Sequence, residues 1–138
     1  MRFARAYFVL ALAIGVAACS PSPPPAVPDS SAGSANGARL YSGNCAGCHQ
    51  ESGQGIPGVY PSLVGSPVVL GDPGVLAAWI VKGRRPPVTP AGRFPTIMPQ
   101  FVWLRPEDVA ALLNFLRSNF GNHAAPVDAG VVAKALQE

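Results

Sequence analysis

Apolar residues recur every three or four positions in two parts of the chain, which is the spacing of one face of an α-helix. The first part covers 73–82, and Gly83 follows it where a C-terminal glycine commonly ends a helix. Its apolar positions are Val75, Leu76, Trp79 and Ile80. The second part begins at Pro106, a residue type favoured in the first turn of a helix. Its apolar face consists of Val109, Leu112, Leu113, Phe115 and Leu116.

Two shorter segments carry weaker helical signals. One covers 37–43, and the other covers 128–136, where Asp128 is of a type that caps helix N-termini. Many of the 15 glycines and 16 prolines lie between residues 53 and 99, and no stretch has the pattern of a convincing strand. We therefore predict an all-α domain of three to five helices joined by long Gly/Pro-rich loops.

The N-terminus has the pattern of an export signal. Arg2 and Arg5 precede an apolar run at 6–18, which is too short to span a bilayer comfortably. The run ends in Val16-Ala17-Ala18-Cys19, which resembles the lipoprotein box of bacteria with Val in place of the common Leu. This resemblance implies that Cys19 carries the lipid and that the protein is periplasmic and anchored to the inner or outer membrane. The alternative is ordinary cleavage near Ala18, which leaves Cys19 as a free thiol.

The composition divides the chain into four parts. Residues 1–18 are the predicted signal peptide, and 19–35 form a Pro/Ser-rich tether with too little apolar bulk to fold. Residues 36–122 form the folded domain, and 123–138 are a C-terminal extension that includes the weaker helical segment.

The charge balance argues against a nucleic-acid-binding protein. Ten basic and seven acidic residues give a formal net charge of +3, and loss of Arg2 and Arg5 with the signal leaves eight against seven, or +1. Such a small charge gives no basic field for a nucleic acid. Several basic residues and no acidic one lie between Asp72 and Glu107, among them Lys82, Arg84, Arg85 and Arg93. Such a group is typical of a solvated loop, or of a site that neutralises anionic groups or docks a partner.

The strongest chemical signal is Cys45-Ala46-Gly47-Cys48-His49. Two cysteines in this spacing followed by histidine form the attachment motif of c-type haem, in which the thiols bond to the haem and the imidazole ligates the iron. A zinc site would need two further ligands, and His123 is the only other histidine. A thioredoxin-like redox site would need a strand and a βαβ pattern around it. We therefore predict one covalent haem c on Cys45 and Cys48, with His49 on its iron.

The residues leave two candidates for the sixth position of the iron. Met98 is the only methionine once the signal is removed, and it lies just ahead of the last strong helix. A lone methionine more often fills a core. His123 is the other candidate, although its polar surroundings are typical of an exposed histidine.

From Gly37 to about Asn122 the chain resembles a class I cytochrome c domain. It is especially similar to the C-terminal haem module of the cytochrome subunits of bacterial membrane-bound alcohol and gluconate dehydrogenases. The matching segments are Gly37-Ala38-Arg39-Leu40-Tyr41, Asn44 to Gln50, Gly53 to Leu63, Met98-Pro99-Gln100-Phe101 and the closing helix. The resemblance implies the cytochrome c fold, with its helices wrapped around one haem.

The resemblance also assigns roles to single residues. It implies that Met98 is the second axial ligand and that the carbonyl of Pro61 accepts a hydrogen bond from His49. It places Gly37 and Tyr41 against the last helix, at Leu112, Phe115 or Leu116. Further residues are candidates for packing on the haem or binding its propionates, or else ordinary core and surface residues. These are Tyr60, Trp79, Arg84, Arg85 and Trp103.

With both axial positions filled, the iron has no open site for a substrate, which favours an electron carrier over an enzyme. The expected role is transfer of single electrons from a periplasmic dehydrogenase to a terminal oxidase or another cytochrome, as a free carrier or as a subunit of a dehydrogenase complex. One alternative is a haem enzyme such as a peroxidase, in which Met98 leaves the iron. Another is a sensory or assembly role. Neither a nucleic acid nor a small-molecule substrate is expected.

Overall fold

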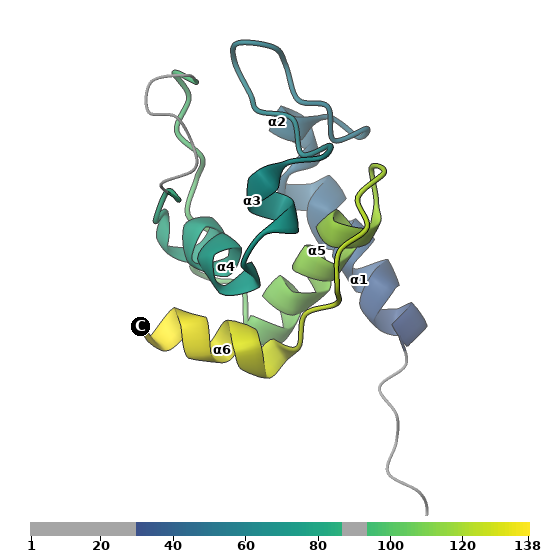
Figure 1. Ribbon diagram of the computed structural model, residues 1–138, viewed down its shortest axis with the longest axis vertical. Coiled ribbons are helices and arrows are strands. Elements are labelled where there is room, and N and C mark those ends of the chain that lie inside the picture. The colour runs from purple at the N-terminus through teal and green to yellow at the C-terminus, as the bar shows by residue number, and fades with distance from the viewer. Residues whose placement is uncertain (1–29, 87–93) are drawn as a thin grey trace, which may run out of the picture.

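The computed structural model describes residues 30–86 and 94–138. Within these ranges the chain forms six α-helices and no strand, with one isolated bridge between Ile56 and Tyr60 (Figure 1). The all-α prediction is therefore confirmed. The helices are α1 (Ser30–Asn44), α2 (Ala46–His49), α3 (Pro67–Leu70), α4 (Pro73–Lys82), α5 (Pro106–Ser118) and α6 (Ala129–Gln137).

The local signals in the sequence placed three of these helices. Helix α4 has the predicted bounds: Asp72 Oδ1 accepts from two amides of its first turn, and Gly83 ends it in the left-handed conformation with φ of 70°. Helix α5 begins at Pro106, and α6 follows Asp128, whose Oδ1 accepts from Gly130 N at 2.6 Å. Capping bonds of this kind satisfy amides that have no partner inside the helix.

The helices of the structure differ from the predicted ones in two respects. Helix α1 begins at Ser30 rather than near Gly37, so residues 30–35 are helical rather than part of the tether. The sequence did not indicate this first part of α1, because its serine, alanine and glycine residues have no apolar periodicity. The helix can nevertheless extend towards the N-terminus, because no proline lies between Pro28 and the packed part of α1 to interrupt it. Two further helices, α2 and α3, were not predicted, because four residues are too few to show a helical period. With them the described residues contain six helices.

Helices α1 and α5 lie side by side and share the most extensive contact between any two of the described helices (Figure 1). Gly37 permits this approach, since a Cβ at that position would overlap the carbonyl oxygen of Ala111. The Tyr41 ring packs with its centroid 5.3 Å from that of Phe115 and 5.0 Å from that of Phe120. The implied contact of Gly37 and Tyr41 with the last helix is therefore present.

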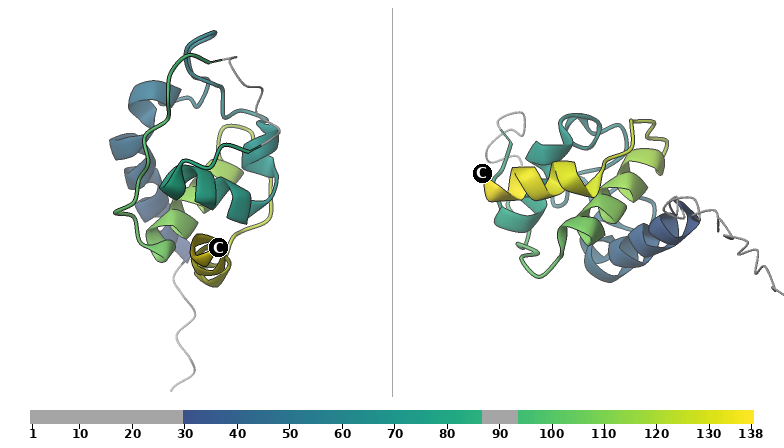
Figure 2. Two further views of the ribbon diagram at one scale, coloured as in Figure 1. Left: turned by 90° about the vertical axis from the view of Figure 1, so that its left-hand side faces the viewer. Right: turned by 90° about the horizontal axis from the view of Figure 1, so that it is seen from below.

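The C-terminal helix α6 packs across α4 and α5, as the view from below shows (Figure 2). Asn114 on α5 holds the start of this extension, with its Oδ1 accepting from Val127 N at 2.6 Å and its Nδ2 donating to Val127 O at 3.0 Å. Val132 of α6 is fully buried. The extension therefore belongs to the same core as the helices that precede it.

None of the helices in the described ranges has the length and apolar character needed to cross a bilayer. The predicted signal peptide, Cys19, the tether up to residue 29 and Arg93 lie outside the described residues.

Candidate functional site

A cavity of about 380 Å³ opens between α2, α3, α4 and the segment that leads to α5. Its volume lies within the range of about 300–1,000 Å³ that is usual for cofactor and ligand sites. The walls are mainly apolar and include Leu63, Val68, Val69, Leu76, Ile80, Phe101 and Leu116. Cys45, Cys48, His49 and Met98 line the same cavity, so the fold brings together all four residues of the predicted haem site.

His49 is oriented by the backbone of the loop that follows α2. Only 8% of the residue is exposed, and its Nδ1 lies 2.9 Å from the carbonyl oxygen of Pro61. Because a carbonyl can only accept, Nδ1 carries the hydrogen and Nε2 is left with a free lone pair. Burial lowers the pKa of the imidazole, and the bond to Pro61 opposes this shift. A neutral imidazole fixed in this way is suited to ligate a metal ion through Nε2.

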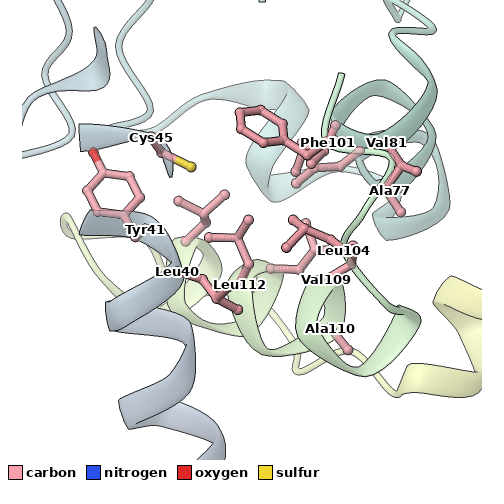
Figure 3. Packing of buried hydrophobic residues seen from close by; sticks show 14 of the residues in the cluster. Leu40, Tyr41, Cys45, Ala77, Val81, Phe101, Leu104, Val109, Ala110 and Leu112 are labelled. Atoms are coloured by element: carbon pink, nitrogen blue, oxygen red, sulfur yellow. The ribbon is translucent and has the colours of Figure 1, made fainter. Parts of the chain in front are cut away.

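Cys45 lies at the junction of α1 and α2, and Cys48 lies within α2. In Figure 3 the sulfur of Cys45 points away from the end of α1, towards the side of the cluster where Phe101 lies. Burial raises the pKa of the Cys45 thiol to about 11, with a further contribution from Cys48. The free thiol of Cys45 is therefore protonated at neutral pH, unlike the thiolates of redox-active or zinc-binding cysteines. Within the described ranges no three His, Cys, Asp or Glu side chains gather as a metal ion would require.

Met98 enters the cavity from the segment before α5. Its side chain is half-buried and packs against the apolar core. The aromatic residues Tyr60 and Trp79 also line the cavity, as does Arg85. A guanidinium group at this position could pair with an anionic group of a ligand in the cavity.

Three candidate residues lie away from the cavity. Arg84 is not among its lining residues, and its Nη2 donates to the carbonyl oxygen of Glu138 at 3.0 Å. Trp103 is 63% exposed and packs edge-on against Phe101 instead of lining the cavity. His123 is exposed, as its polar surroundings suggested. Arg84 and Trp103 were offered by the sequence either as haem contacts or as ordinary surface and core residues, and neither of them lines the cavity.

Asn122 supports the site and was missed in the sequence. It is 1% exposed, its Nδ2 donates to the carbonyls of Leu63 and Leu116, and its Oδ1 accepts from Gly65 N at 2.8 Å. These bonds attach the loop behind Pro61 to the end of α5. A single asparagine in a polar Gly-Asn-His run gave no signal of burial.

Comparison with known proteins decides the family, since the model of the family described as cytochrome c matches residues 34–120. The chain belongs to the cytochrome c family. It is 34% identical over 93 residues to cytochrome c-552 of Thermus thermophilus, covering 64% of this chain and 70% of that protein. Two dehydrogenase subunits are also similar, and the chain spans a quarter or less of their length.

The first of these is the cytochrome c subunit of the quinone alcohol dehydrogenase of Gluconobacter oxydans, with 38% identity over 90 residues. The match covers 64% of this chain and 19% of that subunit. The second is the cytochrome c subunit of gluconate 2-dehydrogenase of Pantoea cypripedii, with 34% identity over 109 residues. This match covers 76% of the chain and 25% of the subunit. The resemblance to alcohol and gluconate dehydrogenase cytochromes is therefore confirmed.

Members of this family bind haem c covalently, and Cys45, Cys48 and His49 form its attachment motif here. The cavity fits the group, because it is apolar, presents both thiols and holds a neutral imidazole in a fixed orientation. When bound, haem c supplies reversible one-electron chemistry. Electron transfer is thus the function of this cytochrome c domain, and none of the three relatives above is named as a peroxidase.

Proposed function

We propose that this cytochrome c transfers single electrons from a dehydrogenase to a terminal oxidase or another cytochrome at the periplasmic face of a bacterial membrane. The observation that carries the proposal is that His49 and Met98 line one mainly apolar cavity. His49 and Met98 would hold the iron of the haem, and with both bound no position would remain for a substrate. The apolar residues around the cavity would exclude water, and the bound haem would supply reversible one-electron chemistry.

Ligation by Met98 is tested by absorption spectra of oxidised and reduced protein. We expect the oxidised wild type to show the weak sulfur-to-iron charge-transfer band of methionine ligation, and Met98→Ala to lose it and to bind carbon monoxide once reduced. His123→Ala is the matched control, because it removes the other candidate ligand, and it should leave the spectrum unchanged. A wild type without the band that binds carbon monoxide readily would favour the enzyme alternative and overturn the carrier proposal.

The dehydrogenase donor is supported by the names of the relatives, which are subunits of alcohol and gluconate dehydrogenases. The test uses membranes that contain such a dehydrogenase, mixed with the oxidised cytochrome. Addition of ethanol or gluconate should reduce the cytochrome within the turnover time of the dehydrogenase. If the cytochrome stays oxidised while an artificial acceptor is reduced, the proposed donor is wrong.

Membrane attachment is supported by the sequence around Cys19, which resembles a lipoprotein box. Expression of the full chain in a bacterium that processes lipoproteins should place the wild type in the membrane fraction, with the mass of a diacylglycerol on the N-terminal cysteine. The Cys19→Ser variant should instead be released in soluble form with its haem intact. Release of the wild type without detergent would contradict the lipid anchor.

A further inference from the structure

Arg117 is a buried arginine that neither the family motif nor the predicted site includes. It lies near the C-terminal end of α5, and only 6% of the residue is exposed. A charged side chain in such a place is normally paired with an opposite charge, because desolvation of an unpaired charge is costly. In the described ranges the ion pairs all belong to Arg105, and no carboxylate lies within ion-pair distance of Arg117.

Three backbone carbonyls take the place of a carboxylate. Nη1 of Arg117 donates to Val69 O at 2.7 Å and to Gly71 O at 2.8 Å, and Nε donates to Ala125 O at 3.0 Å. Carbonyl dipoles satisfy the hydrogen-bonding needs of the guanidinium group, but they leave its net positive charge in place.

The guanidinium lies directly behind the wall of the haem cavity. Val69, which accepts one of its bonds, is 1% exposed and lines the cavity, as does Leu116, the neighbour of Arg117 in α5. The third carbonyl belongs to Ala125, which lies beyond the residues matched by the family model. The charge is therefore held between the cavity wall and the C-terminal extension, which lies outside the match to the family model.

We propose that Arg117 is a positioning residue that fixes the α3 wall of the cavity and, through its uncompensated buried charge, raises the reduction potential of the haem. Oxidation of the iron adds one positive charge inside the cavity. A fixed positive charge close by, in a region of low dielectric constant and shielded from salt, disfavours that oxidised state. This proposal rests on the electron-transfer function of the domain, but it does not depend on Met98 being the second ligand.

The test compares variants that keep and remove the charge, using the holoprotein with the full C-terminal extension. Arg117→Lys keeps the charge but cannot form the same fork of hydrogen bonds, whereas Arg117→Met and Arg117→Gln remove the charge. Lys134→Met is the matched control, because it removes one positive charge from an exposed position on α6. Reduction potentials are measured by redox titration at mildly acidic pH, where a lysine better keeps its proton, and urea unfolding is measured on the same samples.

At a given applied potential, we expect the ratio of oxidised to reduced protein to be roughly tenfold higher in the two neutral variants than in the wild type. For a one-electron couple this corresponds to a decrease of about 59 mV in the reduction potential. Arg117→Lys should keep most of the wild-type potential although it unfolds at lower urea, and Lys134→Met should keep both. A purely structural role would lower stability in every Arg117 variant without separating Lys from the neutral residues. Equal potentials in Arg117→Lys and in whichever neutral variant folds would overturn the proposal, whatever the spectra show about Met98.

Discussion

The contact between α1 and α5 at Gly37 gives a stability prediction with a clear sign. In most helices Gly→Ala stabilises by about 0.5–1 kcal/mol, because glycine loses more backbone freedom on folding. At Gly37 the added Cβ would overlap Ala111 O and lie 2.8 Å from the Cβ of Phe115. The first obstacle is backbone, so relief requires α1 to move away from α5 as a unit.

The expected net effect of Gly37→Ala follows from these two terms. Forcing an extra methyl into a packed contact costs about 1–3 kcal/mol, and backbone obstruction places Gly37 at the upper end of this range. After the helix-propensity gain is subtracted, we expect a loss of about 2 kcal/mol in the free energy of unfolding. For a domain of this size that loss lowers the melting temperature by roughly 8–16 °C.

The matched control for this prediction is Gly43→Ala in the same helix. Gly43 is exposed, and a Cβ there would meet no atom within 4 Å. It should therefore leave stability unchanged or raise it by up to about 1 kcal/mol. Urea unfolding of both holoproteins, followed by circular dichroism, gives the two free energies. The argument from close helix packing is refuted if Gly37→Ala proves as stable as Gly43→Ala.

Two further predictions concern polar side chains that join segments distant in sequence. Asn122→Ala leaves buried carbonyl and amide groups without partners, so we expect the free energy of unfolding, measured with urea or heat, to fall by about 2–4 kcal/mol. A decrease of less than about 1 kcal/mol would contradict the role of Asn122 in holding the loop. At Asp108, bonds from Arg105 and then from Asn36 lower the carboxyl pKa. Its stabilisation is therefore complete above the unfolded-state pKa of about 3.9 and disappears as the pH falls through the lower folded-state pKa. Urea unfolding should show Asp108→Asn less stable than the wild type at neutral pH and equal to it in strong acid, and a gap that persists in acid would disprove the linkage.

The features that the sequence predicted correctly are those whose causes are local. Asp72 and Gly83 bound α4 through contacts within one helical turn, and Pro106 marks the start of α5 in the same way. The attachment motif for haem c is similarly local, because Cys45, Cys48 and His49 are nearly adjacent in the chain. Pro61 and Met98 were assigned from the family resemblance, since their own neighbours contain no comparable signal.

The features that the sequence did not predict depend on residues far away in the chain. In the sequence, Arg117 looked like a basic residue that interacts favourably with the C-terminal end of its helix. In the structure it is buried instead, and it bonds to carbonyls of residues that lie 46 and 48 positions earlier in the chain. Arg84 and Arg85 are adjacent and looked equivalent, but a bond to the last residue of the chain, 54 positions later, turns Arg84 away while Arg85 faces the cavity. Charge and hydropathy patterns do not contain such pairings, because these are fixed only when the helices pack.

The segment from residue 50 to residue 71, in which α3 is the only helix, shows how a stretch with little regular structure can form one wall of a site. Few of its backbone groups are satisfied by helices, so its carbonyls need other donors. Four side chains supply them at successive points along the segment, and these donors are Tyr41, His49, Asn122 and Arg117, bonded to the carbonyls of residues 50, 61, 63 and 69. Since three of the donors lie outside the attachment motif, the orientation of His49 depends on α1, on the end of α5 and on the residues just after it as much as on the motif itself. The high glycine and proline content of the segment is compatible with a fixed site because its shape is held from outside by these bonds.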